Sequence, residues 1–214
     1  MTITASDLRG MITAISATIA ENVSMLNALD SALGDGDHGT TISGGFAAAA
    51  EQTASAASPF DVLRLTGMTL MNRMGGSSGA LFGTLFVQAA MTVKDVETLT
   101  LQQFAAMWQA GNDGVMKRGK AAPGDKTMVD ALSPAVAALR QSVAQGETME
   151  QALRAAAAAA AQGANATTEM TARHGRAQYV GERAVGHMDA GAQSVALMFS
   201  AMHDYWKGKD DGKT

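Results

Sequence analysis

Asp30, Asp35 and Asp37 fall close together in this 214-residue chain, in the segment 30–39 that we call the acidic loop. Glycines at positions 34, 36 and 39 oppose a regular helix there. Two carboxylates about 4 Å apart repel by roughly 4 kcal/mol at a protein surface, so converging carboxylates need protons, solvent or a cation. A hard cation such as Mg²⁺ suits these oxygens best, and the glycine N–H groups could meet phosphate oxygens. The segment therefore predicts a magnesium-bridged phosphate site with these three aspartates as metal ligands.

Three other interpretations of the acidic loop are weaker. The aspartates could simply cap helices and make turns, but three carboxylates exceed what capping needs. The run from Gly34 to Gly39 matches G-x-G-x-x-G, yet a dinucleotide fingerprint follows a strand and places no carboxylate at the pyrophosphate. An EF-hand starting at Asp35 fails because its twelfth position is Phe46 in place of glutamate.

The residues that follow the aspartates, and a second glycine-rich segment, could bind phosphate. His38 precedes Thr40 and Thr41 at a predicted helix start, where N–H and hydroxyl groups could hold an anion. A single histidine fits a phosphate or metal-supporting role and a structural hydrogen bond equally well. The segment Gly75-Gly-Ser-Ser-Gly79 leads into an apolar helix and favours an anion-binding nest over close helix packing through small residues.

A third glycine-rich segment, Gly119 to Thr127, differs from a Walker A loop. Asp125 stands between the glycine and Lys126, and no strand precedes the segment. Lys126 could neutralise phosphate charge or pair with an aspartate of the acidic loop. An ordinary ion pair with Asp125 at a helix start is an equal alternative.

The last glycine-rich segment, residues 175–191, carries more charge and glycine than a connector requires. Arg176 is a candidate for phosphate contact because its guanidinium fork matches phosphate oxygens. Glu182 and Arg183 could equally form a structural ion pair. The chain has no cysteine and no G-x-S-x-G elbow, so we expect metal electrostatics rather than a protein nucleophile.

Composition predicts one all-α domain spanning residues 1–214, with a frayed tail at 207–214. Alanine, leucine and methionine are the commonest apolar residues, and only three prolines occur. The net charge is −4 and basic residues form no stripe, so we expect no nucleic-acid partner. The N-terminus lacks the features of a signal peptide, so we expect a cytoplasmic location. The uncharged stretch 74–93 contains too few consecutive apolar residues to span a bilayer, so we expect no membrane partner.

Apolar residues recur at helical spacing in eight segments, which predicts eight helices. These helices must position the glycine-rich loops described above. Pro134 must kink the sixth helix or mark its late start. An up-and-down arrangement would bring alternate loops to one end and make a single composite site. The predicted helices begin at a Ser6 cap, near Thr40, at Ser58-Pro59, at Gly75–Gly79 and at Thr100, and continue with 128–143, 150–172 and 195–206.

Several ordered motifs together resemble the nucleotide-binding L subunit of bacterial dihydroxyacetone kinase over nearly the full length. This resemblance implies a closed barrel of eight antiparallel amphipathic helices with Mg-ADP at one end. The motifs that carry it are 34–39, 75–79 with 81–84, 118–120, 123–127, 175–176, 181–183 and 186–192.

The resemblance also implies roles for individual residues. Asp30, Asp35 and Asp37 would bind two magnesium ions that bridge the nucleotide phosphates. The nucleotide-binding positions would be His38, Gly39, Thr40, Thr41, Ser77, Ser78, Gly119, Met128, Arg176, Asp189, Ala190 and Gly191.

In the family that the chain resembles, bound ADP accepts phosphate from a phosphohistidine on a phosphotransferase-system M subunit. The resulting ATP then phosphorylates dihydroxyacetone on a K subunit, so the implied partners are these two subunits and a nucleotide. The main alternative is a nucleotide-binding subunit of an ATP-dependent ketose or dihydroxyacetone kinase that uses exchangeable ATP. A magnesium-dependent nucleotide sensor without enzymatic activity is a further alternative.

Overall fold

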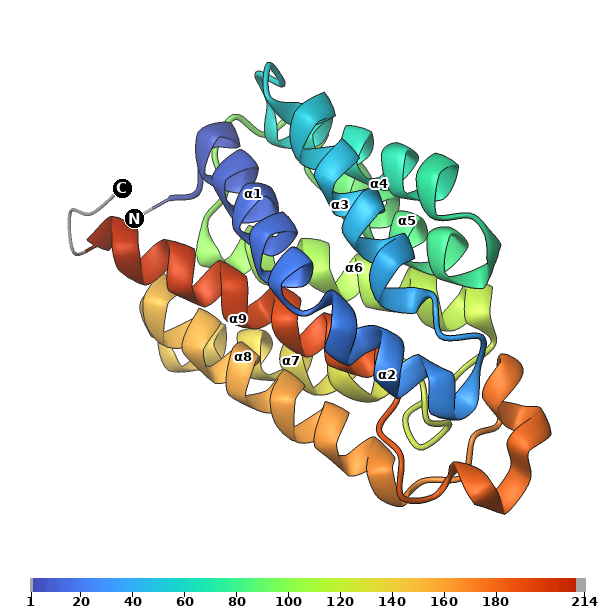
Figure 1. The fold of residues 1–214 in the computed structure, drawn as a ribbon. Coiled ribbons are helices and arrows are strands. Elements are labelled where there is room, and N and C mark those ends of the chain that lie inside the picture. Colours follow the sequence, from blue (N-terminus) through green and yellow to red (C-terminus); the bar gives the residue numbers. More distant parts are fainter. Residues whose placement is uncertain (1, 211–214) are drawn as a thin grey trace.

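The computed structural model describes residues 2–210, and over these residues the protein is all-α (Figure 1). The only extended pairing in this range is an isolated bridge between Ile3 and Leu99. The helices are α1 (Ala5–Glu21), α2 (Val23–Leu33), α3 (His38–Thr53), α4 (Pro59–Met74), α5 (Gly76–Met91), α6 (Leu101–Gly119), α7 (Val129–Gln145), α8 (Met149–Ala166), the 3₁₀ helices η1 (Thr167–Glu169) and η2 (Arg176–Ala184), and α9 (Ala190–Asp210).

Hydroxyl caps start several of these helices. The side chains of Ser58 and Thr100 each accept a hydrogen bond from the third backbone N–H of their helix, which confirms both predicted starts. The first start is Thr4 rather than the predicted Ser6, because Thr4 forms a capping box with Asp7. The single first helix that we predicted is divided into α1 and α2 at Asn22.

Two further boundaries differ from the sequence prediction. Pro134 lies inside α7, which begins at Val129, so the proline does not mark a late start. The alanine-rich helix α8 ends at Ala166 instead of residue 172. The hydroxyl of Thr167 donates to the carbonyl oxygen of Ala164 at the end of α8. Thr167 is also the first of the three residues of the 3₁₀ helix η1, in which the chain turns.

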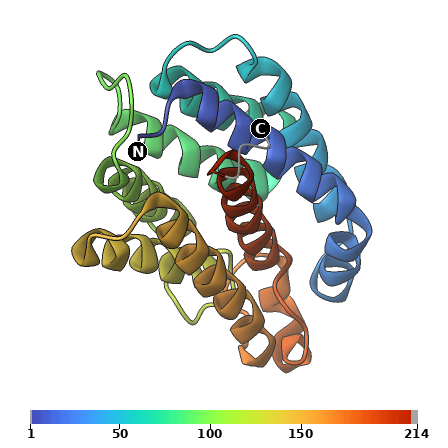
Figure 2. The same ribbon diagram turned by 90° about the vertical axis from the view of Figure 1, so that its left-hand side faces the viewer.

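Most helices that follow one another in the chain pack against each other, and the last helix packs against the first. Each helix from α3 to α8 contacts the next along the chain, and α9 contacts both α8 and α1. Helices α1 and α2 both contact α3 and α9, so together they occupy the place predicted for one helix. Figure 2 shows α9, in dark red, between α8 and α1.

Aromatic side chains join the helices at the centre of the core. Trp108 of α6 is surrounded by Phe86, Phe104 and Phe199, whose ring centroids lie 5.9, 6.1 and 5.0 Å from that of Trp108. All four side chains are buried. Burial of large apolar surface is the main stabilising contribution to such a bundle.

The loops after α2, α4, α6 and α8 lie at one end of the bundle, at the lower right of Figure 1, and the start of α1 and the end of α9 lie at the other. Residues 207–210, part of the predicted frayed tail, continue α9. Lys209 forms an ion pair with Asp7 and lies over the ring of Trp206. Residues 211–214 lie outside the described range. None of the helices in residues 2–210 is long and apolar enough to cross a bilayer.

Candidate functional site

Four loops surround a cavity of about 610 Å³ at this end of the bundle. The cavity lies between the acidic loop, the α4–α5 turn, the α6–α7 loop and the segment 167–189, which we call the α8–α9 loop. Most of the residues that we predicted for the site line this cavity: Asp30, Asp35, Asp37, His38, Thr41, Ser77, Ser78, Gly119, Met128, Asp189, Ala190 and Gly191.

Asp30, in the last turn of α2, organises the acidic loop. Its Oδ2 accepts hydrogen bonds from the backbone N–H groups of Gly36, Asp37 and His38, at 2.9, 3.0 and 3.2 Å. A carboxylate that accepts several N–H groups is fixed in orientation. The chain therefore folds back over α2 and brings all three aspartates of the loop to one place.

Asp30, Asp35 and Asp37 each offer a carboxylate oxygen, and these oxygens all lie within 4.8 Å of one another. Asp35 and Asp37 are exposed, whereas Asp30 is partly buried. A cluster made only of carboxylate oxygens is the ligand chemistry that Mg²⁺ prefers. The three residues therefore fit a divalent cation, and they would hold it at the mouth of the cavity.

His38 is buried at the start of α3, and its ring has a partner. Its Nε2 lies 2.8 Å from the hydroxyl oxygen of Ser194 in α9, and its ring centroid lies 6.4 Å from that of Phe82. Burial lowers the pKa of His38, although Asp30 and Asp37 act in the opposite direction. A neutral ring with a structural hydrogen bond follows, and one edge of this residue still lines the cavity.

Gly39 and Thr40, which we predicted as nucleotide contacts, do not line the cavity. A Cβ at Gly39 would overlap the carbonyl oxygen of Val23, so this glycine allows α3 to approach α2 closely. The Thr40 hydroxyl accepts a hydrogen bond from the side-chain amide of Asn27, and the Thr40 N–H donates to the same side chain. Both residues join α2 to α3 beside the acidic loop.

Ser77 and Ser78 lie in the first turn of α5, whose N-terminus opens on the cavity. Gly75 and Gly76 have positive φ angles of 64° and 53°, which favour glycine. The first N–H groups of a helix have no helical partner and attract anions. This turn can therefore present backbone donors to a phosphate on the side of the cavity opposite α2.

The α6–α7 loop contributes a buried lysine. Lys126 is 1% exposed and lines the floor of the cavity, and its Nζ donates to the main-chain carbonyl oxygens of Thr167 and His187. The ion pair with Asp125, one of the alternatives that the sequence left open for Lys126, does not form: Asp125 instead contacts Arg173 and His174. Burial lowers the pKa of Lys126, while Asp189 and Asp130 act to raise it.

Asp130, which does not line the cavity but supports the loop that does, was missed by sequence reasoning. It is 4% exposed, and its carboxylate accepts hydrogen bonds from the N–H groups of Gly124 and Thr127. It thereby shapes the α6–α7 loop beneath the cavity. The sequence offered one signal, an acidic residue in the first turn of a helix that follows a glycine-rich loop.

Asp189 ends the α8–α9 loop and starts α9. Its Oδ1 accepts the N–H of Ala192 at 2.7 Å, as a helix-capping residue does, and Ala190 and Gly191 follow it along the cavity wall. Burial, together with the nearby Asp130, raises the pKa of Asp189 to about 6, against the effects of the Ala192 hydrogen bond and Lys126. The side chain of Arg176 lies outside the part of the chain that the structure describes.

Taken together, the cavity is lined by clustered carboxylates and by the first turn of a helix with its free backbone donors. This combination is suited to a metal-bound polyphosphate. The protein is thus an all-helical domain with a candidate site for such a ligand at one end. The family model described as "DAK2 domain" matches residues 32–204, and the chain belongs to this family.

Curated relatives agree with this assignment. The chain is 45% identical over 83% of its length to the protein named PEP-dependent dihydroxyacetone kinase, ADP-binding subunit DhaL, of Escherichia coli K12, and covers 85% of that protein. It is 35% identical to the PTS-dependent counterpart of Lactococcus lactis, covering 88% of it. It is also 37% identical to D-erythrulose kinase of Mycolicibacterium smegmatis, of which it covers 34%.

A solved structure has the same fold. The dihydroxyacetone kinase of C. freundii, crystallised in complex with AMP-PNP and Mg²⁺, superposes with a TM-score of 0.72 at 29% sequence identity. The match covers 95% of this chain and 34% of the C. freundii chain, so this protein spans about a third of that enzyme.

Proposed function

We propose that this protein is the ADP-binding subunit of a phosphoenolpyruvate-dependent dihydroxyacetone kinase, and hence part of a phosphotransferase. The observation that carries the proposal is the cluster of three aspartates, with carboxylate oxygens within 4.8 Å of one another, in the cavity that the first turn of α5 also lines. Support comes from relatives of this name that match over most of their length.

In this proposal Asp30, Asp35 and Asp37 hold two Mg²⁺ ions, which neutralise charge on the phosphates during an in-line transfer. Ser77, Ser78 and the N–H groups of the first turn of α5 orient the phosphates from the opposite side. Gly119, Met128, Ala190 and Gly191 form the remaining walls around the nucleotide.

The proposal includes two protein partners. A phosphotransferase-system M subunit carries a phosphohistidine that phosphorylates the bound ADP, and a K subunit holds dihydroxyacetone for the second transfer. The chain contains no cysteine, which agrees with partners that contribute the reacting groups.

A finer description of the fold belongs to the same proposal: a closed up-and-down barrel of eight antiparallel positions, with α1 and α2 sharing one of them. The contacts of α9 with both α8 and α1 support this description. In such a barrel alternate loops meet at one end, as the four loops around the cavity do.

The experiment is reconstitution with a K subunit, an M subunit and phosphoenolpyruvate, without added nucleotide. Protein that retains ADP through gel filtration should form dihydroxyacetone phosphate under these conditions. Asp37→Asn serves as the negative control because it removes a proposed metal ligand. If wild-type protein with ADP bound forms no product although both partners are active, the proposal fails.

Exchangeable ATP is the second candidate, favoured by the similarity to D-erythrulose kinase and to the triokinase/FMN cyclases of mammals. In this case a separate subunit would still supply the ketose. Radiolabelled ADP loaded into the protein distinguishes the two, since label retained over many turnovers supports a bound cofactor. Rapid loss of label into free ATP supports exchange.

A further inference from the structure

The α8–α9 loop is closed at its base by hydrogen bonds between its two ends. The N–H of Gly186 donates to the carbonyl oxygen of Thr168 at 2.8 Å, and the N–H of Asp189 donates to the hydroxyl of Thr167 at 2.9 Å. We call these paired ends, residues 167–168 and 186–189, the neck of the loop. The two ends of the loop are therefore close together, as they are in an Ω-loop.

Lys126 bridges the neck from below. Its Nζ donates to the carbonyl oxygens of Thr167 and His187, which lie on the two sides of the neck. The side chain is 1% exposed and approaches from the α6–α7 loop, where Lys126 has a positive φ of 60°. Burying an ammonium group is costly unless hydrogen bonds compensate, so the two carbonyls and the lysine hold one another in place.

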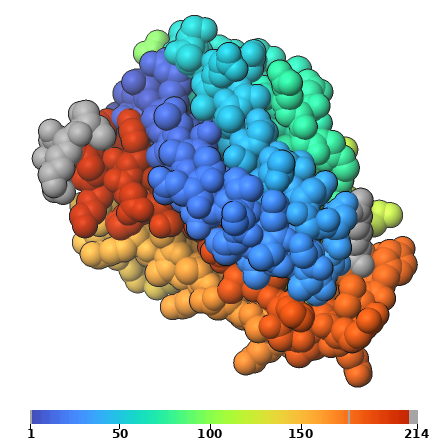
Figure 3. All heavy atoms as spheres, in the orientation of Figure 1, coloured from blue at the N-terminus to red at the C-terminus, as the bar shows by residue number. Residues whose placement is uncertain are grey.

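The body of the loop lies against the acidic loop side of the cavity. Ala172 and Ala184 are buried against Leu33, the last residue of α2, and form a small apolar cluster apart from the main core. Figure 3 shows this loop, in orange at the lower right, against the blue end of α2. The loop also supplies His174, Gly175 and Ala177 to the cavity wall.

The α8–α9 loop therefore forms part of the cavity wall, and its apolar contacts with α2 are few. The small apolar cluster is too limited to fix a loop of this length, whereas a buried charged hydrogen-bonding group at the neck can do so. Asp125 adds a second, more exposed connection through its backbone oxygen to the N–H of Arg173 and through its carboxylate to His174.

We propose that Lys126 is a positioning residue that holds the neck of the α8–α9 loop closed and thereby sets the rate at which bound nucleotide leaves the cavity. This inference rests on the proposed function, because it requires Mg-ADP in the cavity. It assigns Lys126 to the loop rather than to the phosphates: the lysine acts by keeping the neck together, and the loop retains the nucleotide.

The test is the dissociation rate of a fluorescent ADP analogue, measured by chasing the Mg²⁺ complex with unlabelled ADP. For Lys126→Met we expect the analogue to dissociate about tenfold faster or more, as for loss of a hydrogen bond to a charged group. Its association rate should stay within about twofold of wild type. Hydrogen exchange at the N–H groups of Gly186 and Asp189 should also accelerate, because both donate across the neck.

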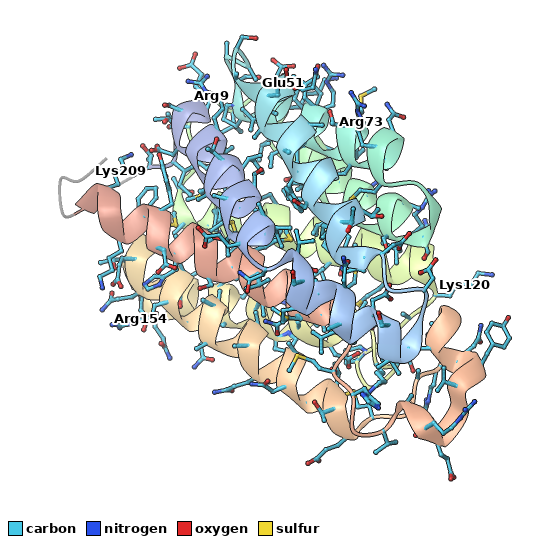
Figure 4. All side chains as sticks on the ribbon, viewed as in Figure 1. Arg9, Glu51, Arg73, Lys120, Arg154 and Lys209 are labelled. Carbon is cyan, nitrogen blue, oxygen red and sulfur yellow. The ribbon has the colours of Figure 1, made fainter. Side chains whose placement is uncertain are left out.

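Two further variants separate this role from general destabilisation. Lys120→Met is the matched control, since Lys120 lies in the same loop with a positive φ of 52° but points outward (Figure 4). The chain contains no cysteine, so Lys126→Cys can be alkylated in denaturant with 2-bromoethylamine and refolded, which restores an amine at this position alone. The aminoethylated protein should recover slow release, whereas the unmodified cysteine variant should not.

Unchanged release from a folded Lys126→Met protein would overturn the inference, as would a change confined to the association rate. If Lys126→Met does not fold, the comparison of unmodified and aminoethylated Lys126→Cys decides the question. Wild-type protein that binds no fluorescent ADP in the presence of Mg²⁺ would instead contradict the proposed function itself.

Discussion

Nε2 of His38 in α3 lies 2.8 Å from Oγ of Ser194 in α9, a buried contact between residues far apart in the chain. The Ser194 hydroxyl donates its hydrogen to the carbonyl oxygen of Ala190. With the hydroxyl hydrogen assigned in this way, Nε2 donates to Ser194 and the neutral ring carries its lone pair on Nδ1. The start of α9 thus fixes the orientation of the histidine that follows the acidic loop.

Ser194→Ala should destabilise the protein by about 1–3 kcal/mol, because it leaves the buried N–H of His38 without an acceptor. Urea unfolding at pH 7.5 measures the change. Ser31→Ala is the control: Ser31 makes the same type of bond to the carbonyl four residues earlier, but it is exposed and contacts no histidine. Equal losses in the two variants would argue against the role of the His38 contact.

Asp37→Asn should abolish the stabilisation that Mg²⁺ and ADP confer together. Ligand at about 100 times its Kd raises the free energy of unfolding by about 2.7 kcal/mol, and this gain requires intact metal ligands. Asp37 is exposed, so the variant should fold normally without ligand. Thermal unfolding with and without Mg-ADP measures the difference.

The control for this prediction is Asp95→Asn, an exposed aspartate in the α5–α6 connection, outside the cavity. It should retain the whole ligand-induced shift. A full shift in Asp37→Asn would remove Asp37 from the metal site.

The pH dependence of stability should reveal the ion pair of Asp7 at the opposite end of the bundle. Burial raises the pKa of Asp7, but hydrogen bonds from Lys209 and Thr4 outweigh it and hold the pKa below its ordinary value. A carboxylate whose pKa is lower in the folded than in the unfolded protein stabilises the fold fully at pH values above its pKa in the unfolded chain, about 3.9. This stabilisation is lost as the pH falls through the pKa of the folded protein. Asp7→Asn should therefore cost about 2 kcal/mol at pH 7.

The difference between Asp7→Asn and wild type should narrow below about pH 4, which urea titrations between pH 2 and 7 can follow. Asp61→Asn is the matched control. Asp61 occupies the same position relative to the Ser58 cap of α4, but its side chain is 42% exposed. Its replacement should change stability by less than about 1 kcal/mol. A constant deficit of Asp7→Asn across the whole pH range would contradict this assignment.

The acidic loop and most helix starts could be predicted from sequence because their signals are local. Three aspartates within a few residues of one another, and a serine directly before Pro59, determine geometry through neighbours in the chain. The same local reasoning failed at Ser6, where Thr4 and Asp7 form the better capping box.

Residues whose partners are distant in the chain could not be assigned. From the sequence we predicted that Gly39 contacts the nucleotide. In the structure it allows α3 to pack closely on α2, because a Cβ at this position would overlap the carbonyl oxygen of Val23. For Lys126 the sequence left open a phosphate contact, a pair with an acidic-loop aspartate and an ion pair with Asp125. In the structure its Nζ donates to carbonyl oxygens of the α8–α9 loop. Tertiary packing decides both cases, and sequence periodicity carries no information about it.

The contact between α7 and α8 gives the last prediction. Pro134 has no N–H, so the carbonyl oxygen of Asp130, four residues earlier, lacks its helical donor. A Cβ at Gly163 of α8 would overlap this oxygen and lie 3.0 Å from Cα of Ala131. Both obstacles are backbone atoms, so Gly163→Ala must push the helices apart and should cost about 1–3 kcal/mol.

Gly44→Ala is the control, because Gly44 lies inside α3 and no atom comes within 4 Å of its added Cβ. It should stabilise the protein by about 0.5–1 kcal/mol through helix propensity alone. Since the carboxylate of Asp130 also holds the N–H groups of Gly124 and Thr127, displacement of α7 should loosen the α6–α7 loop as well. Gly163→Ala should therefore weaken Mg-ADP binding in calorimetry, and unchanged stability and binding would show that the two helices can separate without cost.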